Sequence, residues 1–223
     1  MKPYYSHAGI TIYHGDCREV MSSLHWDVIV CDPPYGLGIE LSRRNGERIQ
    51  GDSTTAIRDF IVGIPYGPKL IFGSPSIPEP PGDKFKLIWD KSELTGMGDL
   101  RFPWKQSHEE IYVYGSGFES SRRRGSVLRY PLRPSWTKHP EAVSNLHPTE
   151  KPLSLMVDLL ECCPWSDVLD PTCGTGTTLQ AAKKLGKSAI GIEIEEKYCE
   201  IAAKRLSQEV LQFEPEQRTQ SKP

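Results

Sequence analysis

Short apolar runs that end in turn-forming residues constrain the fold of this chain more than any other feature. Val28–Cys31 leads into Asp32-Pro33-Pro34-Tyr35, and Val168-Leu169 leads into a Gly-containing turn at Asp170–Thr177. Apolar runs of this length, bounded by Pro and Gly, are typical of strands that are buried on both faces of a parallel sheet. Segments with helical spacing lie between them, and this alternation predicts an α/β fold.

The same pattern continues along the chain and places the other elements. Strands are expected near Thr11–His14, Val28–Cys31, Leu70–Phe72, Lys86–Trp89, Ile111–Tyr114, Val168-Leu169 and Ala189–Ile194. Helices are expected near Asp16–Leu24, Thr55–Val62 and Pro152–Cys162, then from the Gly-containing turn to Leu185 and from Glu195 to about Leu211. We therefore expect a mostly parallel sheet with helices on both of its faces.

Length and composition favour one domain of ordinary globular character. The 223 residues are 37% hydrophobic and 25% charged, and a domain usually has roughly 100–200 residues. We expect a single domain over residues 1–212 and a disordered polar tail over 213–223. No apolar run approaches the ~20 residues that span a bilayer, and no secretory signal follows Met1. We therefore expect a cytoplasmic protein, with a phage or plasmid origin left open.

The six cysteines and the net charge exclude little by themselves. No cysteine pair has CxxC spacing or a neighbouring histidine at ligand spacing, so we expect reduced thiols and no metal site. The formal net charge is −2, but nucleic-acid binding depends on where the cations lie. Between Ser120 and Pro140 there is no Asp or Glu, and this segment carries Arg122, Arg123, Arg124, Arg129, Arg133 and Lys138.

The Gly-containing turn is a candidate ligand site. In Asp170–Thr177 a carboxylate ends a strand and a Gly-X-Gly turn opens a helix, whose N-terminus favours an anionic group. Such turns also serve close packing alone. Glu193, at the end of the next strand, adds a carboxylate that can accept hydrogen bonds from ribose hydroxyls. Neither GxGxxG nor GxxxxGK[ST] aligns here, so a nucleoside ligand without pyrophosphate, such as S-adenosylmethionine, fits best.

The Asp32–Tyr35 turn is a second candidate site at a strand end. Pro-Pro is a common loop element, and the turn can be read as no more than that. However, the two prolines stiffen the backbone and present the Asp32 carboxylate and the Pro33 carbonyl as acceptors, while Tyr35 offers a ring for stacking. An amino group on a base that is flipped out of a duplex needs such acceptors and a stacking partner.

Taken together, these blocks resemble the amino-methylating DNA methyltransferases of the permuted beta class, adenine-specific type. The resemblance rests on Gly15-Asp16, Val28–Tyr35, His147–Pro152 and Val168–Thr177, continuing to Glu193 and Arg205-Leu206. The catalytic block precedes the cofactor block, as is typical of that class. The Gly-containing turn differs in having Thr172-Cys173 where Pro-Phe is usual.

The resemblance implies a seven-stranded, circularly permuted, Rossmann-like methyltransferase sheet and assigns roles to residues. Asp32, Pro33, Pro34 and Tyr35 are the implied catalytic residues. Asp16 lies near the cofactor adenine, Glu193 near its ribose, and Asp170 with Lys151 near its methionine end. The full cofactor-binding set is Asp16, Cys17, Asp32, Thr149, Lys151, Asp170, Cys173, Gly174, Gly176, Thr177 and Glu193. The block His147–Pro152 also fits a helix N-terminus with Thr149 as its cap.

The basic segment is the expected DNA-recognition insert, over about residues 115–145. Arg122, Arg123, Arg124, Arg129, Arg133 and Lys138 are the candidate DNA-binding residues, and a solvated basic loop is the alternative. The expected partner is double-stranded DNA, bound by a monomer or a homodimer.

The base that the chain modifies is left open by the residues themselves. Asp rather than Ser at position 32 favours the adenine 6-amino group by resemblance. The cytosine 4-amino group, RNA adenine and a catalytically silent DNA-binding subunit remain alternatives, and the companion nuclease of a restriction-modification system is undetermined.

Overall fold

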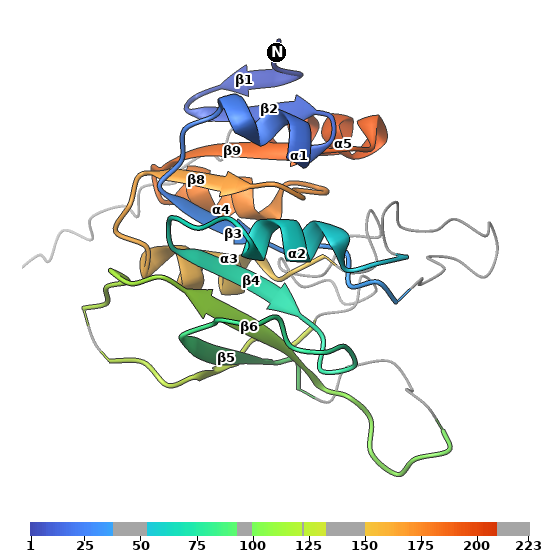
Figure 1. Ribbon diagram of the computed structural model, residues 1–223. Coiled ribbons are helices and arrows are strands. Elements are labelled where there is room, and N and C mark those ends of the chain that lie inside the picture. The colour runs from blue at the N-terminus through green and yellow to red at the C-terminus, as the bar shows by residue number, and fades with distance from the viewer. Residues whose placement is uncertain (38–52, 93–99, 122, 133–149, 209–223) are drawn as a thin grey trace, which may run out of the picture.

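The computed structural model describes residues 1–37, 53–92, 100–121, 123–132 and 150–208. Within these ranges, nine strands form one sheet in the order β1-β2-β9-β8-β3-β4-β6-β5-β7 (Figure 1). The strands are β1 Tyr5–His7, β2 Ile10–His14, β3 Val28–Cys31, β4 Lys69–Gly73, β5 Phe85–Asp90, β6 His108–Tyr114, β7 Val127–Arg129, β8 Asp167–Asp170 and β9 Ser188–Glu193. The helices are α1 Cys17–Val20, the 3-10 helix η1 Met21–Ser23, α2 Ala56–Val62, α3 Leu153–Glu161, α4 Thr177–Lys184 and α5 Glu196–Ser207.

The sheet is mostly parallel, as predicted. The strands β2, β9, β8, β3 and β4 are parallel neighbours, and β7 runs parallel to β5. The strand β6 is antiparallel to both β4 and β5, which agrees with the lack of a crossover helix in the sequence between β5 and β6. Parallel strands need a helical crossover, whereas antiparallel neighbours do not.

The strand count of seven was wrong for the described residues. One more short strand lies on each side of the sheet, as the outermost strands β1 and β7. All seven expected strands are present, as β2 to β6, β8 and β9. The strand β1 pairs antiparallel with β2 through a turn at Ala8 and Gly9, whose φ angles are 49° and 78°. Two left-handed residues suit a tight hairpin, but Ala is unusual there. Strands of three residues, such as β1 and β7, carry no periodic signal in the sequence.

Alternate residues of β3 point into two apolar layers, one on each face of the sheet. Val28 and Val30 pack in one cluster with buried residues of α3, α4 and α5, whereas Ile29 and Cys31 pack in the other with α1, η1 and α2. All four side chains are fully buried, as expected for a central parallel strand. Figure 1 shows α1 and α2 on one face and α3, α4 and α5 on the other, which confirms the expected helices on both faces.

The two candidate turns meet at one edge of this sheet. The name 'carboxyl edge' is used for the side of the sheet on which β3, β4, β8 and β9 finish. The name 'opposite edge' is used for the side on which these strands start. The strands β3 and β8 are direct neighbours, so the turns that follow them lie side by side although they are far apart in the sequence. Ligands of open α/β sheets bind at such an edge.

No helix in the described part of the chain has the length and apolar character needed to cross a membrane.

Candidate active site

A cavity of about 700 Å³ lies at the carboxyl edge and brings the two turns together. Asp32 and Tyr35 line it from the turn after β3, and Asp170 and Gly174 line it from the turn after β8. The two turns are also linked directly, because the hydroxyl of Thr172 donates a hydrogen bond to the Asp32 carbonyl over 3.2 Å. A cavity of this size with a small set of convergent polar groups is typical of small-molecule binding sites in proteins.

Glu193, at the end of β9, is held by backbone amides of the surrounding turns. Its carboxylate accepts hydrogen bonds from the amide of Gly174 over 2.9 Å and from the amide of Glu195 over 2.8 Å. Burial raises the pKa of Glu193, and the two amide hydrogen bonds oppose this shift. Asp16 is brought to the same end of the cavity because the Gly15 amide donates to the Glu193 carbonyl over 2.9 Å.

Asp16 has a structural role that accompanies its place in the cavity wall. It caps the N-terminus of α1, where its carboxylate accepts a hydrogen bond from the Arg18 amide over 2.9 Å. The Arg18 side chain forms an ion pair with the same carboxylate, and this hydrogen-bonded pair lowers the pKa of Asp16. Cys17, the next residue, also lines the cavity, and burial raises the pKa of its thiol to about 11. This thiol therefore stays protonated at neutral pH.

Asp170 is the carboxylate with the most perturbed proton affinity in the cavity. Burial raises the pKa of Asp170 to about 7, and the negative charges of Asp32 and Glu193 add to the shift. Hydrogen bonds from the Thr172 amide, over 3.1 Å, and from Thr178 oppose it. Within the described residues Asp170 forms no ion pair with a cationic side chain. A buried carboxylate in this state favours a cationic ligand, which would supply the missing counter-charge.

The two glycines of the Gly-containing turn differ in what surrounds them. Gly174 lines the cavity with a φ of 50°, and no heavy atom lies within 4 Å of the position of a Cβ. Gly176 has a φ of 82°, begins α4, and would place a Cβ 3.0 Å from the Cβ of Ala202. It does not line the cavity. Its absent side chain lets α4 pack against α5, whereas Gly174 leaves the cavity open to a ligand.

The Asp32–Tyr35 turn is held by a largely buried network of charged groups. The Tyr35 hydroxyl donates to Asp32 over 2.6 Å and to Glu109 over 3.1 Å. The Lys151 ammonium donates to the second oxygen of Asp32 and forms an ion pair with Glu109 over 3.2 Å. Lys91 pairs with the other oxygen of Glu109. Lys151 thus lies between the carboxylates of Asp32 and Glu109 and is bonded to both.

The charges in this network set the protonation of its members. Burial lowers the pKa of Lys151, but the carboxylates of Asp32 and Glu109 raise it by more, so the net shift is upward. Burial raises the pKa of Glu109, and Lys151 and Lys91 outweigh it, so the net shift is downward. Burial and the two carboxylates raise the pKa of Tyr35 well above its usual range. At neutral pH, Lys151 is therefore charged, Glu109 is ionised and Tyr35 is a hydrogen-bond donor.

Aromatic rings complete the surroundings of Lys151. Its ammonium lies 5.1 Å from the ring centre of Phe72 and 5.8 Å from those of Tyr35 and Trp89. Only 6% of its side chain is exposed. Cation–π contacts of this kind are strongest where water is excluded. Lys151, placed near the methionine end of the cofactor by resemblance, is thus bonded here to Asp32 and lines the same cavity.

Sequence reasoning missed several charged residues that line the cavity, among them Glu109, Lys91 and Glu150. Glu109 and Lys91 belong to neighbouring strand ends in the antiparallel part of the sheet, which carries no recognisable motif. Glu150 accepts a hydrogen bond from the Thr177 hydroxyl over 3.1 Å and forms an ion pair with Arg205 over 2.5 Å. The only available signal for Glu150 was its place in the His147–Pro152 block, next to Lys151. Thr149 of that block lies outside the described residues.

The basic segment does not form one surface. Arg124 forms ion pairs with Asp158 and with Glu161, the latter over 2.9 Å, near the C-terminus of α3 at the opposite edge. Arg123 lies beside it and is exposed. Arg129, at the end of β7, lies at the carboxyl edge in register with Asp90 and is 3.5 Å from its carboxylate. Arg124 and Arg129 therefore lie at different ends of the strands, and the DNA-binding role of the segment stays a prediction. Arg122, Arg133 and Lys138 lie outside the described residues.

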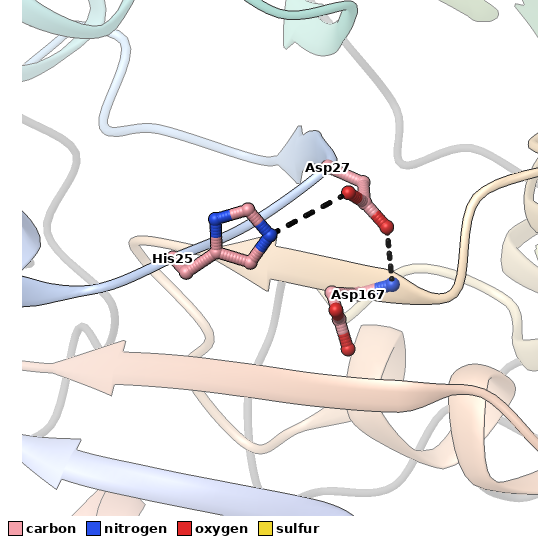
Figure 2. Close-up of side chains that lie close together, drawn as sticks. All are labelled: His25, Asp27 and Asp167. Atoms are coloured by element: carbon pink, nitrogen blue, oxygen red, sulfur yellow. Dashed lines mark hydrogen bonds and ion pairs between the residues drawn. The ribbon is translucent and has the colours of Figure 1, made fainter.

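One group of side chains in the described ranges has the spacing of a metal site. It consists of His25, Asp27 and Asp167, whose ligand atoms lie within 4.8 Å of one another. Figure 2 shows the Asp27 carboxylate between the His25 ring and the Asp167 amide, 3.8 Å and 3.1 Å away. It also accepts from the Ser166 amide over 3.3 Å. These contacts join the segments that enter β3 and β8 at the opposite edge, which explains the group without a metal ion.

Comparisons with known proteins agree with this geometry. The family described as DNA methylase, of N6 and N4 methyltransferases, matches residues 78–204, more than half of the chain. Type II methyltransferase M.ScaI of Streptomyces caespitosus is 26% identical over 93% of this chain and 84% of its own length.

Solved structures show the same fold. The crystal structure of the M1.HpyAVI–SAM complex aligns with a TM-score of 0.58 and 26% identity, over 88% of this chain and 99% of its own. PvuII DNA methyltransferase, described as cytosine-N4-specific, aligns with a TM-score of 0.70 over 93% of this chain and 89% of its own. Its 14% identity shows the fold alone. The predicted methyltransferase fold and the predicted cofactor are confirmed. The chain belongs to the DNA methylase family, and it is an S-adenosylmethionine-dependent DNA methyltransferase that acts on amino groups of bases.

Proposed function

We propose that this chain methylates the 6-amino group of adenine in double-stranded DNA, as an enzyme of the permuted beta class. The observation that carries the proposal is the shared cavity, in which the Asp32–Tyr35 turn faces Asp170 and Glu193. The family match begins at residue 78, after this turn, so the catalytic role of the turn rests on its geometry and on its resemblance to that class. The type II name of the relative M.ScaI is in keeping with a restriction-modification role.

The residues along β8 and β9 fit S-adenosylmethionine. Glu193 is positioned to accept hydrogen bonds from ribose hydroxyls, and Asp16 lies beside it toward the adenine. Asp170 is the buried carboxylate that favours a cation, and the amino group of the methionine end supplies one. S-adenosylmethionine carries its methyl group on a sulfonium. The neutral sulfide that remains after transfer is a good leaving group. The protein therefore has to align the two reactants rather than activate the donor.

The residues after β3 fit the acceptor amine. Each carboxylate oxygen has two lone pairs, so Asp32 can accept an amino hydrogen while it keeps its bonds to Tyr35 and Lys151. The Pro33 carbonyl offers a second acceptor, and the stiff Pro33-Pro34 backbone holds both in place. Accepting both hydrogens directs the nitrogen lone pair toward the methyl carbon. As the nitrogen–carbon bond forms, the carbon–sulfur bond breaks, S-adenosylhomocysteine leaves, and the methylated amine releases one proton. The bond from the Lys151 ammonium fixes the orientation of the Asp32 carboxylate, and Tyr35 presents a ring for stacking of the flipped base.

The preference for adenine rests on Asp32, because adenine-specific enzymes of the resembled class carry Asp where cytosine-specific enzymes carry Ser. The alternative of cytosine N4 methylation uses the same geometry and is an outcome of the test. The purified protein would be incubated with S-adenosylmethionine and unmethylated genomic DNA, and the nucleosides would be analysed by mass spectrometry. We expect N6-methyladenine in one sequence context, which long-read sequencing identifies.

The matched variants are Asp32→Asn and Glu119→Gln. Asp32 lines the cavity, whereas Glu119 is exposed and follows β6 at the opposite edge. Asp32→Asn should remove the product, and Glu119→Gln should form it at the normal rate. N4-methylcytosine as the product would overturn the adenine assignment, and equal activity of the two variants would overturn the catalytic role of the turn.

A further inference from the structure

A short loop beside the cavity exposes three large apolar side chains in succession. Leu100, Phe102 and Trp104 have exposed fractions of 79%, 64% and 82%. They alternate with the exposed cations Arg101 and Lys105, and residues 100–107 contain no Asp or Glu. We call residues 100–106 the aromatic loop. A concentration of exposed apolar side chains on a soluble domain marks an interaction site, and the cations indicate that its partner is anionic.

The aromatic loop is placed at the mouth of the active-site cavity. It lies in the connection from β5 to β6, and Lys91 and Glu109 at the two ends of that connection line the cavity. Its last residue, Gln106, also lines the cavity and accepts a hydrogen bond from the Ser76 hydroxyl over 3.0 Å. The Lys91 amide donates to the Ser107 carbonyl over 2.8 Å and closes the base of the connection. In Figure 1 residues 100–106 project beyond the end of β4, away from the sheet.

We propose that the aromatic loop inserts Phe102 and Trp104 into the DNA helix next to the target base. The inference deepens the proposed function and rests on it, because a base that enters the cavity leaves a gap in its stack. Apolar and aromatic side chains stabilise an opened step by occupying such a gap or by stacking on the neighbouring bases. Arg101 and Lys105 contact the flanking phosphates.

DNA, rather than a second copy of this chain, is the occupant that the surroundings favour. The loop borders the cavity that receives the base, and its charge is complementary to a phosphate backbone. The cation Arg129 lies at the same carboxyl edge, on the neighbouring strand β7. Other exposed aromatic side chains, Tyr66 and Phe85, lie at the opposite edge next to the starts of β4 and β5. A second cavity, of about 470 Å³, lies beside them and is lined by Pro65, Gly67 and Lys84, but neither the Asp32–Tyr35 turn nor the Gly-containing turn contributes to it.

The test compares Trp104→Ala and Phe102→Ala with Phe85→Ala, an equal truncation of an exposed aromatic at the opposite edge. Each protein is titrated with a duplex that carries 2-aminopurine at the target adenine, whose fluorescence rises when the base leaves the stack. We expect the two loop variants to bind the duplex roughly 5- to 100-fold more weakly, given about 1–3 kcal/mol per stacked base and tenfold per 1.4 kcal/mol. They should also lose most of the fluorescence rise, whereas Phe85→Ala should match the wild type.

A duplex with an abasic site at the target position separates insertion from a general loss of affinity. The gap is present there from the start, so stacking by the loop should make the wild-type protein prefer it, and the loop variants should lose that preference. S-adenosylmethionine affinity, measured by calorimetry, should be the same in all proteins and shows that the variants are folded. Loop variants that bind and flip the base like the wild type would overturn the proposal.

Three further outcomes have distinct meanings. If the loop variants change the sedimentation of the protein but leave DNA binding intact, the loop is an interface between copies and the proposal is wrong. If the wild type transfers no methyl group to adenine but the loop variants still lose affinity for the duplex, the adenine assignment fails while the DNA contact stands. If the wild type methylates adenine and the loop variants do so at the same rate and affinity, only the loop proposal fails.

Discussion

Asp32 and Asp170 stand at the ends of neighbouring parallel strands, each followed directly by a proline, yet their surroundings differ. Asp32 is bonded to the Lys151 ammonium and the Tyr35 hydroxyl. Asp170 is bonded only to amide and hydroxyl donors among the described residues, and burial raises its pKa to about 7. The protein thus provides its own cation for the carboxylate that we propose faces the base. It leaves the other carboxylate to be ionised by the ligand that it binds.

Replacing Asp32 should have the largest effect, and it should fall on chemistry alone. Loss of a transition-state hydrogen bond costs about 100-fold or more in rate, so Asp32→Ala should reduce single-turnover methylation by at least that factor. S-adenosylmethionine affinity should stay within a few fold, because Lys151 keeps Glu109 as a partner over 3.2 Å. Calorimetry and single-turnover kinetics measure the two quantities. A large loss of cofactor affinity with normal chemistry would show that Asp32 serves the cofactor instead.

Substitution of Glu109 tests whether its carboxylate holds the Lys151 ammonium in place beside Asp32. We regard Glu109 as a positioning residue, and Glu109→Gln should lower kcat by about 10- to 100-fold through misplacement of Lys151 and Tyr35. The carboxylate of Glu109 raises the pKa of Lys151, so its removal should lower that pKa. Activity should then be lost at a lower alkaline pH than in the wild type. A loss of activity that is equal at every pH would indicate a structural role only.

The control for this experiment keeps the charge and changes its reach. Glu109→Asp should restore the wild-type pH profile in part, because a carboxylate remains between Lys151 and Lys91. Tyr112→Phe, which removes a hydroxyl bonded to Glu110 at the next position of β6, should leave the pH profile unchanged. A shift of the profile in Tyr112→Phe would show that the whole strand end, rather than Glu109, sets it.

Asp170 should make cofactor binding depend on pH. Its carboxyl group has a pKa of about 7 in the free protein, and a cationic ligand favours the ionised form. Binding must therefore release a proton below pH 7, so affinity should rise by up to about tenfold per pH unit toward pH 7 and level off above it. Calorimetry from pH 5.5 to pH 8.5 measures this trend. Asp170→Asn should bind weakly with a flat profile, and a slope that persists in this variant would assign the titration to another group.

The contrast between the two carboxylates also shows where sequence reasoning succeeded and where it ended. Asp32 and Asp170 were found because each follows a buried apolar run and precedes a turn residue, which is local information. Glu109 and Lys91 come from antiparallel strands that meet the site only through the order of the sheet, and no local pattern marks them. The strand β1 was missed because Ala8 occupies a left-handed position that usually holds Gly, Asn or Asp.

The basic segment shows the same limit of local information. Its arginines were grouped by closeness in the sequence. The strand β7, however, extends from the opposite edge to the carboxyl edge and separates the arginines before it from the arginine at its end. Arg124 precedes β7 and Arg129 ends it. A strand of three residues with its flanking turns is enough to carry side chains from the opposite edge to the carboxyl edge, at about 3.3 Å per residue. Charge clustering in a sequence therefore predicts a basic surface only where the local backbone is known.

The two edges can be compared directly by Arg124→Ala and Arg129→Ala, for which the expected effects are the smallest. Arg129 is 81% exposed at the carboxyl edge, and if it contacts one phosphate, its loss should reduce the slope of log affinity against log salt by about one unit. The stability of the Arg129→Ala protein should barely change.

Arg124 is 24% exposed and paired with Asp158 and Glu161, so its loss should lower the free energy of unfolding by about 1 kcal/mol. The DNA affinity and salt slope of Arg124→Ala should stay at wild-type values, because the cavity proposed to take the base is at the carboxyl edge. Fluorescence titrations over a salt series and thermal unfolding of both variants measure these quantities. A reduced slope in Arg124→Ala, with Arg129→Ala unchanged, would mean that DNA runs along the opposite edge and that the assignment of the two edges has to be reversed.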